Sequence, residues 1–164
     1  NHLDETPRKN LTIRLSPDFE SKSFNEDIRW LEFDPSLKID FGKSNIYKLI
    51  SENRLIIHSY DSTGILETLS KNIPTLIFWQ NDLNHLRNKV KPDYQILADV
   101  GILHFSAKSV ADKVNEIWDD VGKWWNQYDT QEAKNKFCDK FAKNCNNPGK
   151  KLASLLVEKE INFN

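Results

Sequence analysis

Apolar residues along the chain follow two different spacings. Short apolar runs, typical of buried strands, fall at residues 11–15, 37–41, 55–60, 75–79 and 102–105. Segments with apolar residues three and four positions apart, typical of amphipathic helices, lie between them. Strands separated by helices favour parallel pairing through right-handed crossovers, with helices on both faces. The sequence therefore predicts an α/β fold, a doubly wound Rossmann-like parallel sheet.

Several of the predicted helices have recognisable ends. We expect Ser44 to cap the helix that follows it, and Ser109 to open a capping box with Asp112. Asn72, two residues before Pro74, is expected to end its helix in the left-handed conformation. The predicted helices cover residues 25–33, 44–50, 62–72, 93–100, 109–118, 130–144 and 149–160.

The length of 164 residues is in the usual range for one domain. We expect a Rossmann-like part at residues 1–126 and C-terminal helices at residues 127–164 that pack on it. The aromatic residues near the boundary are interpreted as the packing surface of these helices: Trp118, Trp124, Trp125, Phe137 and Phe141. Cys138 and Cys145 are two helical turns apart, too far for a disulfide within one helix, and we expect both to be reduced.

Composition excludes several classes of partner. The net charge is −1 with acidic and basic residues interspersed, so the basic face that binds nucleic acid or anionic lipid is absent. No apolar run approaches the roughly 20 residues that cross a bilayer. The N-terminus lacks the apolar core of a signal peptide, so we expect a cytoplasmic protein. Methionine is absent, even at position 1, and we therefore expect the chain to be part of a longer protein.

In doubly wound sheets ligands bind outside the carboxyl ends of the strands. The run Asp61-Ser62-Thr63-Gly64 follows one predicted strand and opens a helix, where free N–H groups and the helix dipole favour a phosphate. The alternative is that these residues only cap the helix. Glu67 is expected in the first turn of this helix, where it could bind a ribose diol or simply complement the dipole.

Other candidates follow the neighbouring strands. Arg14 and Lys43 are the cations expected near the same edge of the sheet, unless they are solvated surface charges. Trp79 and Asn81 could stack on and hydrogen-bond a base or sugar, although a core tryptophan is the alternative. His58 lies in an apolar run and is interpreted as a packed core histidine. The four histidines lack metal-ligand spacing, so no metal site is predicted.

The stretch from His58-Ser59-Tyr60-Asp61-Ser62-Thr63-Gly64 to Thr75-Leu76-Ile77-Phe78-Trp79 resembles the donor-binding half of GT-B glycosyltransferases. Three further stretches and the Trp-rich tail extend the resemblance to a group of bacterial surface-polysaccharide transferases, over most of the chain after residue 11. These stretches are Arg14-Leu15-Ser16-Pro17, Lys43-Ser44-Asn45-Ile46-Tyr47 and Val100-Gly101-Ile102-Leu103-His104.

The resemblance implies that Ser62, Thr63 and Gly64 meet the phosphates of a nucleotide-sugar donor and that Glu67 meets its ribose. Arg14 matches the arginine of an Arg-x-His-Pro-like element, but Ser16 stands where the histidine would be, so no role of that histidine is carried over.

The resemblance also implies the GT-B C-terminal domain, entered after its first strand and helix. A carbohydrate acceptor would then bind through an N-terminal domain outside this chain, and no catalytic base is assigned. No cofactor is expected besides the donor, which is a substrate. Two alternatives remain: a nucleotide-sugar epimerase-like domain, and a non-catalytic α/β phosphate-binding or regulatory module.

Overall fold

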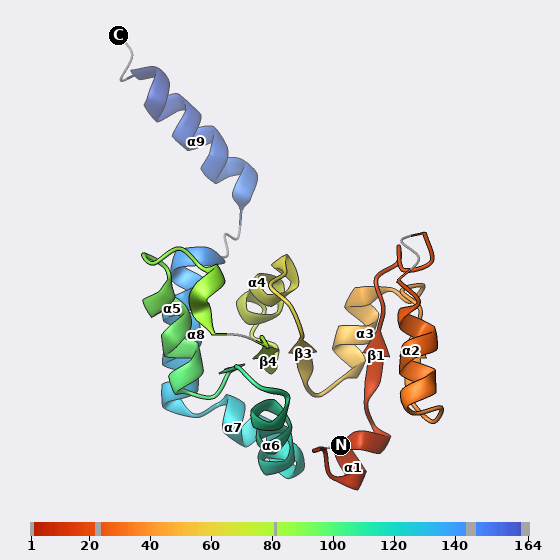
Figure 1. The fold of residues 1–164 in the computed structure, drawn as a ribbon. Helices are drawn as coiled ribbons and strands as arrows, with labels where there is room; N and C mark the ends of the chain where they lie inside the picture. The colour runs from red at the N-terminus through yellow and green to blue at the C-terminus, as the bar shows by residue number, and fades with distance from the viewer. Residues whose placement is uncertain (1, 22–23, 81, 144–146, 162–164) are drawn as a thin grey trace.

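The computed structural model describes residues 2–21, 24–80, 82–143 and 147–161 (Figure 1). All five predicted strands are present, and each is shorter than the apolar run that predicted it. They are β1 Thr12–Arg14, β2 Lys38–Asp40, β3 Ile56–His58, β4 Thr75–Phe78 and β5 Leu103–His104. The helices between and after them are α1 Glu5–Lys9, α2 Glu26–Phe33, α3 Ile46–Glu52, α4 Thr63–Ser70, α5 Lys91–Asp99, α6 Ala107–Ile117, α7 Val121–Trp125, α8 Tyr128–Phe141 and α9 Pro148–Ile161, with short 3₁₀ turns η1 Leu83–His85 and η2 Trp118–Asp120.

Every strand pairing in the described part of the chain is parallel. β1 pairs with β2, and β4 lies between β3 and β5 in a second, three-stranded sheet. Figure 1 shows α4 on one side of β4 and α6 on the other. The predicted Rossmann-like α/β fold is confirmed. The strands form two hydrogen-bonded groups, since no ladder joins β1 to β3 among the described residues.

The main core surrounds the three-stranded sheet. Leu76 and Ile77 of β4 are fully buried, as is Leu69 of α4. The C-terminal aromatic residues extend this core, as the sequence predicted: Trp124, Trp125 and Phe137 are buried, and Trp118 and Phe141 pack against them. Cys138 is a free, half-buried thiol whose pKa is raised by burial, whereas Cys145 lies outside the described residues.

A buried lysine joins α8 to the end of α4. Asn72 has the predicted left-handed conformation, with φ of 57°. Its side-chain oxygen accepts hydrogen bonds from Lys134 Nζ at 2.7 Å and from Trp125 Nε1 at 3.1 Å. Figure 1 shows that α9, in contrast, stands away from the rest of the chain. Its described leucines, Leu152, Leu155 and Leu156, are exposed.

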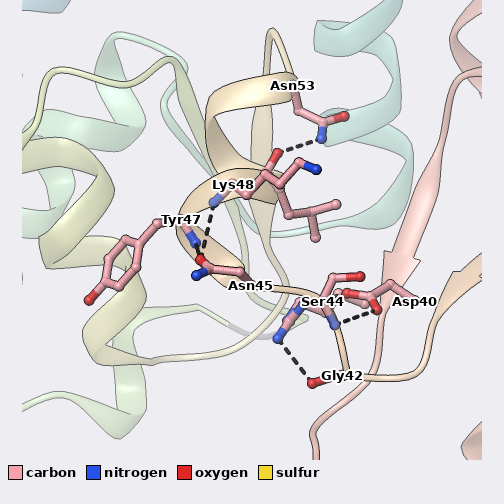
Figure 2. A network of polar contacts seen from close by, with 9 residues as sticks. Asp40, Gly42, Ser44, Asn45, Tyr47, Lys48 and Asn53 are labelled. Carbon is pink, nitrogen blue, oxygen red and sulfur yellow. Dashed lines mark hydrogen bonds and ion pairs between the residues drawn. The ribbon is translucent and has the colours of Figure 1, made fainter.

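The predicted helix caps are wrong by one and three residues. Asn45, not Ser44, caps α3, because its Oδ1 accepts from the N–H groups of Tyr47 and Lys48 (Figure 2). Ser106, not Ser109, caps α6, and its Oγ accepts from Ser109 N at 3.0 Å. The Ser109 hydroxyl lies instead 2.6 Å from Nδ1 of His104.

Hydrogen bonds join the segment that precedes β3 to the α6–η2 region. Asp4 N donates to Asn115 Oδ1 of α6 at 3.0 Å. Arg54, just before β3, donates to the carbonyl oxygen of Trp118 at 2.9 Å and lies over its indole ring. No helix in the described part of the chain is long and apolar enough to cross a bilayer.

Replacement of Gly42 by alanine should destabilise the protein. Gly42 has φ of +76°, and an added Cβ would lie 2.8 Å from the backbone of Pro17. We expect Gly42→Ala to lower the free energy of unfolding by about 1–3 kcal/mol, measured by urea denaturation. Gly149→Ala is the matched control, because a Cβ there meets nothing within 4 Å. Equal stability of the two variants would contradict the strained position of Gly42.

Protonation of His104 should destabilise the fold. His104 Nε2 lies 3.0 Å from the Gly101 carbonyl oxygen, so Nε2–H donates there while Nδ1 accepts from Ser109. Burial lowers the pKa of His104. The unfolded state therefore binds more protons below about pH 6.5, so the free energy of unfolding should fall as pH drops through the lowered pKa.

This pH dependence can be measured by urea denaturation between pH 7.5 and 5. We expect His104→Gln to be less stable at pH 7.5 and to show a smaller decline than the parent chain. His2→Gln serves as the control, since His2 is exposed. An unchanged pH dependence in His104→Gln would show that this imidazole is not the titrating group.

Candidate functional site

Two cavities lie where β3 and β4 end. The larger, of about 580 Å³, is formed by residues that follow these strands and by the turn η1. Its lining residues are Ser59, Tyr60, Asp61, Trp79, Gln80, Asp82, Asn84 and His85. The smaller, of about 230 Å³, is lined by Asp61, Ser62, Thr63, Ile65, Leu66 and Tyr94. The site predicted at the carboxyl ends of the strands therefore coincides with concave surface.

The start of α4 keeps hydrogen-bond donors available. Ser62 occupies the N-cap position in an extended conformation, but its side chain makes no capping hydrogen bond. Ile65 N donates to Ser62 O at 3.1 Å. The backbone N–H groups of Thr63 and Gly64 donate no hydrogen bond within the described part of the chain. The free N–H groups and the positive end of the helix dipole favour an anion here.

Gly64 serves the packing of His58. A Cβ at Gly64 would lie only 2.9 Å from Cε1 of the imidazole. His58 Nε2 lies 3.1 Å from the Thr68 hydroxyl, which can donate to the carbonyl oxygen of Gly64 or Ile65. His58 is packed and hydrogen-bonded, as predicted, but it is half-buried and does not belong to the main core. Burial lowers its pKa, and the Glu67 carboxylate opposes that shift.

Glu67 lies farther along α4 than the sequence suggested. The first turn of α4 contains no acidic residue, because the helix begins at Thr63 and Glu67 follows one full turn later. Its side chain is exposed and lines neither cavity. Helical side chains lean towards the N-terminus, so Glu67 shares the face of α4 that Thr63 occupies.

Trp79 is a core residue that also lines the larger cavity. Trp79 is 5% exposed. The centroid of the His85 ring, which is edge-on, lies 4.7 Å from the centroid of the indole, and the centroid of the Tyr94 ring lies 5.2 Å from it. Trp79 Nε1 has no hydrogen-bond partner among the described residues. Tyr60, which lines the same cavity, is 68% exposed and presents an accessible aromatic ring there. Asn81 lies outside the described residues.

Arg14 and Lys43 belong to the other sheet and line neither cavity. Arg14 forms an ion pair with Asp40 and donates to the Gly42 carbonyl oxygen at 3.3 Å. Burial acts to raise the pKa of Asp40, but hydrogen bonds from Ser44 and the charge of Arg14 outweigh it and lower the pKa. Figure 2 shows Asp40, Gly42 and Ser44 gathered at this turn. The arginine is therefore engaged in the structure of the β1–β2 end, and Lys43 is exposed beside it.

The sequence interpretation did not assign a role to several residues that the structure places at the cavities. Asp82 caps η1 through a hydrogen bond of 2.7 Å from Asn84 N. The Asp-x-Asn spacing is the local signal that could have indicated this turn. Tyr94 comes from α5, and no local pattern predicts its approach. No group of three or more histidine, cysteine, aspartate or glutamate residues in the described part of the chain could hold a metal ion.

The fold and the cavities define a Rossmann-like α/β protein with a potential ligand site at the carboxyl ends of β3 and β4. Residues 1–156 match the family model described as LIC12162 family transferase. The chain belongs to this family and is therefore assigned to a family of transferases. No curated protein and no solved structure gives a match.

Replacement of Gly64 by alanine should displace the imidazole of His58. The new methyl group would lie 2.9 Å from Cε1, closer than van der Waals contact, so the ring should lose its hydrogen bond to Thr68 and become solvated. Because burial is the main cause of the lowered pKa, the pKa of His58 should rise towards about 6.5. Histidine NMR titration measures this shift.

Gly122→Ala is the control for that titration. A Cβ at Gly122 makes only an ordinary contact, 3.5 Å from Asp120 Oδ1. The pKa of His58 should stay unchanged in this variant. An unchanged pKa in Gly64→Ala as well would show that the glycine is not required for the packing of His58.

Proposed function

We propose that this chain is the donor-binding portion of a GT-B glycosyltransferase that acts in cell-surface polysaccharide synthesis. The observation that carries the proposal is the uncapped start of α4 beside two cavities, in a chain that belongs to a transferase family. A nucleotide-sugar donor has an anionic diphosphate between two hydroxyl-rich groups, which matches an anion-favouring helix start beside cavities that contain both polar and apolar side chains.

The diphosphate would lie at the start of α4. The N–H groups of Thr63 and Gly64 and the hydroxyls of Ser62 and Thr63 would donate to its oxygens. When the bond to the sugar breaks, negative charge grows on the diphosphate. Fixed N–H donors and the helix dipole stabilise such charge without reorganisation.

The ribose would extend along the face of α4 that carries Thr63 and Glu67. The Glu67 carboxylate would accept hydrogen bonds from the ribose hydroxyls. Arg14 and Lys43 line neither cavity, and Arg14 is ion-paired with Asp40, so the proposal gives neither of them a contact with the donor.

The remaining parts of the reaction belong to the same proposal. The acceptor would bind through an N-terminal domain, because GT-B transferases react in the cleft between two domains, and no residue is assigned as the catalytic base. The protein would act in the cytoplasm. Membership of a transferase family favours this assignment over a non-catalytic phosphate-binding module.

A calorimetric titration of this chain with UDP, GDP, CDP, ADP and CMP tests the proposal. We expect saturable binding of one nucleotide. Thr63→Ala and Glu67→Ala should each weaken it about tenfold or more, because each removes a hydrogen bond to or from a charged group, worth about 1.5–3 kcal/mol. Both side chains are exposed, so the variants should remain folded.

Glu116→Ala is the matched control for this titration. Glu116 is an exposed residue on α6, on the other side of β4, where it pairs with Lys113. Its removal should leave nucleotide affinity unchanged. Absence of binding to every nucleotide by the folded chain, or equal affinity in all variants, would contradict a donor site at α4.

A further inference from the structure

The larger cavity is rich in hydrogen-bond acceptors and carries negative charge. Asp61 and Asp82 contribute carboxylates, and Gln80 and Asn84 contribute amides. None of the lining residues in the described part of the chain is lysine or arginine. Lys91 donates to Asn84 Oδ1 at 3.4 Å but is not among the lining residues. The cavity therefore favours a ligand that donates hydrogen bonds over one that carries negative charge.

Asp82 is held in position before any ligand arrives. Its Oδ1 accepts from Asn84 N at 2.7 Å, and its Oδ2 accepts from Asn84 Nδ2 at 2.5 Å. Each carboxylate oxygen retains a further lone pair for a ligand. Because these bonds fix the carboxylate, a ligand hydroxyl meets an acceptor that loses little freedom on binding.

Aromatic groups complete the cavity. Tyr60 is largely exposed and presents an apolar ring face, and the buried Trp79 adds an indole whose Nε1 has no partner among the described residues. A buried N–H without an acceptor is unfavourable. A hydroxylated ring that enters the cavity could place its apolar face against the exposed ring of Tyr60. Carboxylates, amides and aromatic rings together suit a sugar.

We infer that the larger cavity holds the sugar of the donor and selects a neutral or amino sugar against a sugar that carries a carboxylate. The inference rests on the proposed donor-binding function and adds the class of sugar transferred. A hexose presents hydroxyl donors to Asp61 and Asp82. A hexuronate places a third carboxylate near these two, and like charges at short range in a partly enclosed site repel.

The test compares two nucleotide sugars that carry the base selected by the nucleotide titration and differ only at the sugar. UDP-glucose and UDP-glucuronate are such a pair. We expect the hexose to bind at least tenfold more tightly, a difference of about 1.4 kcal/mol. In Asp82→Asn the ratio should fall to about threefold or less, because the variant keeps the shape of the side chain and removes its charge.

Asp99→Asn is the control, since Asp99 ends α5, accepts a hydrogen bond from Gln95 at 2.8 Å and lines neither cavity. It should keep the parent ratio. If the nucleotide binds but hexose and hexuronate bind equally, or the hexuronate binds more tightly, the sugar assignment is overturned and the donor site stands. If no nucleotide binds, the donor site itself is overturned and the sugar assignment with it.

Discussion

The burial of β4 is the constraint on which the rest of this structure depends. Leu76 and Ile77 are fully buried, and the strand is hydrogen-bonded to β3 on one edge and to β5 on the other. A strand in this position is apolar on both faces and must be covered on both, which α4 and α6 do (Figure 1). Parallel pairing then brings the carboxyl ends of β3 and β4 side by side. The larger cavity exists because two chain segments leave the sheet at neighbouring points.

The β3–α4 junction shows how packing and ligand binding share a short segment. On the side of α4 that faces the sheet, Thr68 contacts His58 of β3. The imidazole also approaches Gly64 so closely that a larger residue would not fit there. The N-terminal end of the same helix has Ser62 without a capping bond. One end of the helix is thus available to a ligand while its side is fully engaged in the core.

The sequence predicted the five strands and every helix except α1 and α7, because apolar spacing reflects burial directly. The left-handed conformation of Asn72 was predictable from its residue type, because asparagine is one of the few residues other than glycine that adopt positive φ. The starts of α3 and α6 could not be predicted to the residue, because Ser44 and Asn45 can both cap a helix, and so can Ser106 and Ser109. The Ser109 hydroxyl is hydrogen-bonded to His104 instead, and this contact depends on the tertiary packing of α6 against β5.

The expected place of the candidate site could be derived from the sequence, whereas its residues stay a prediction. Its location follows from the strand pattern, and the cavities lie there. Arg14 was expected beside it because topology places the ends of all parallel strands at one edge of a sheet. In the structure the strands form two groups, and Asp40 holds the arginine in the β1–β2 group. Long-range ion pairs of this kind have no local signature.

Two opposite electrostatic preferences meet at Asp61. The start of α4 favours an anion, whereas the larger cavity carries carboxylates, and Asp61 lines both cavities. It also lies close enough to Tyr94 to add to the effect of burial in raising the pKa of that phenol. A ligand with an anionic group and a hydroxylated group joined by a short link satisfies both preferences only in one orientation, with the anion towards Thr63 and the hydroxyls towards Asp82. A nucleotide sugar meets both preferences when its diphosphate lies towards Thr63 and one of its two hydroxyl-rich groups lies towards Asp82. An anion placed in the larger cavity would face Asp61 and Asp82 together, so the same two carboxylates that attract hydroxyls also exclude the reversed orientation.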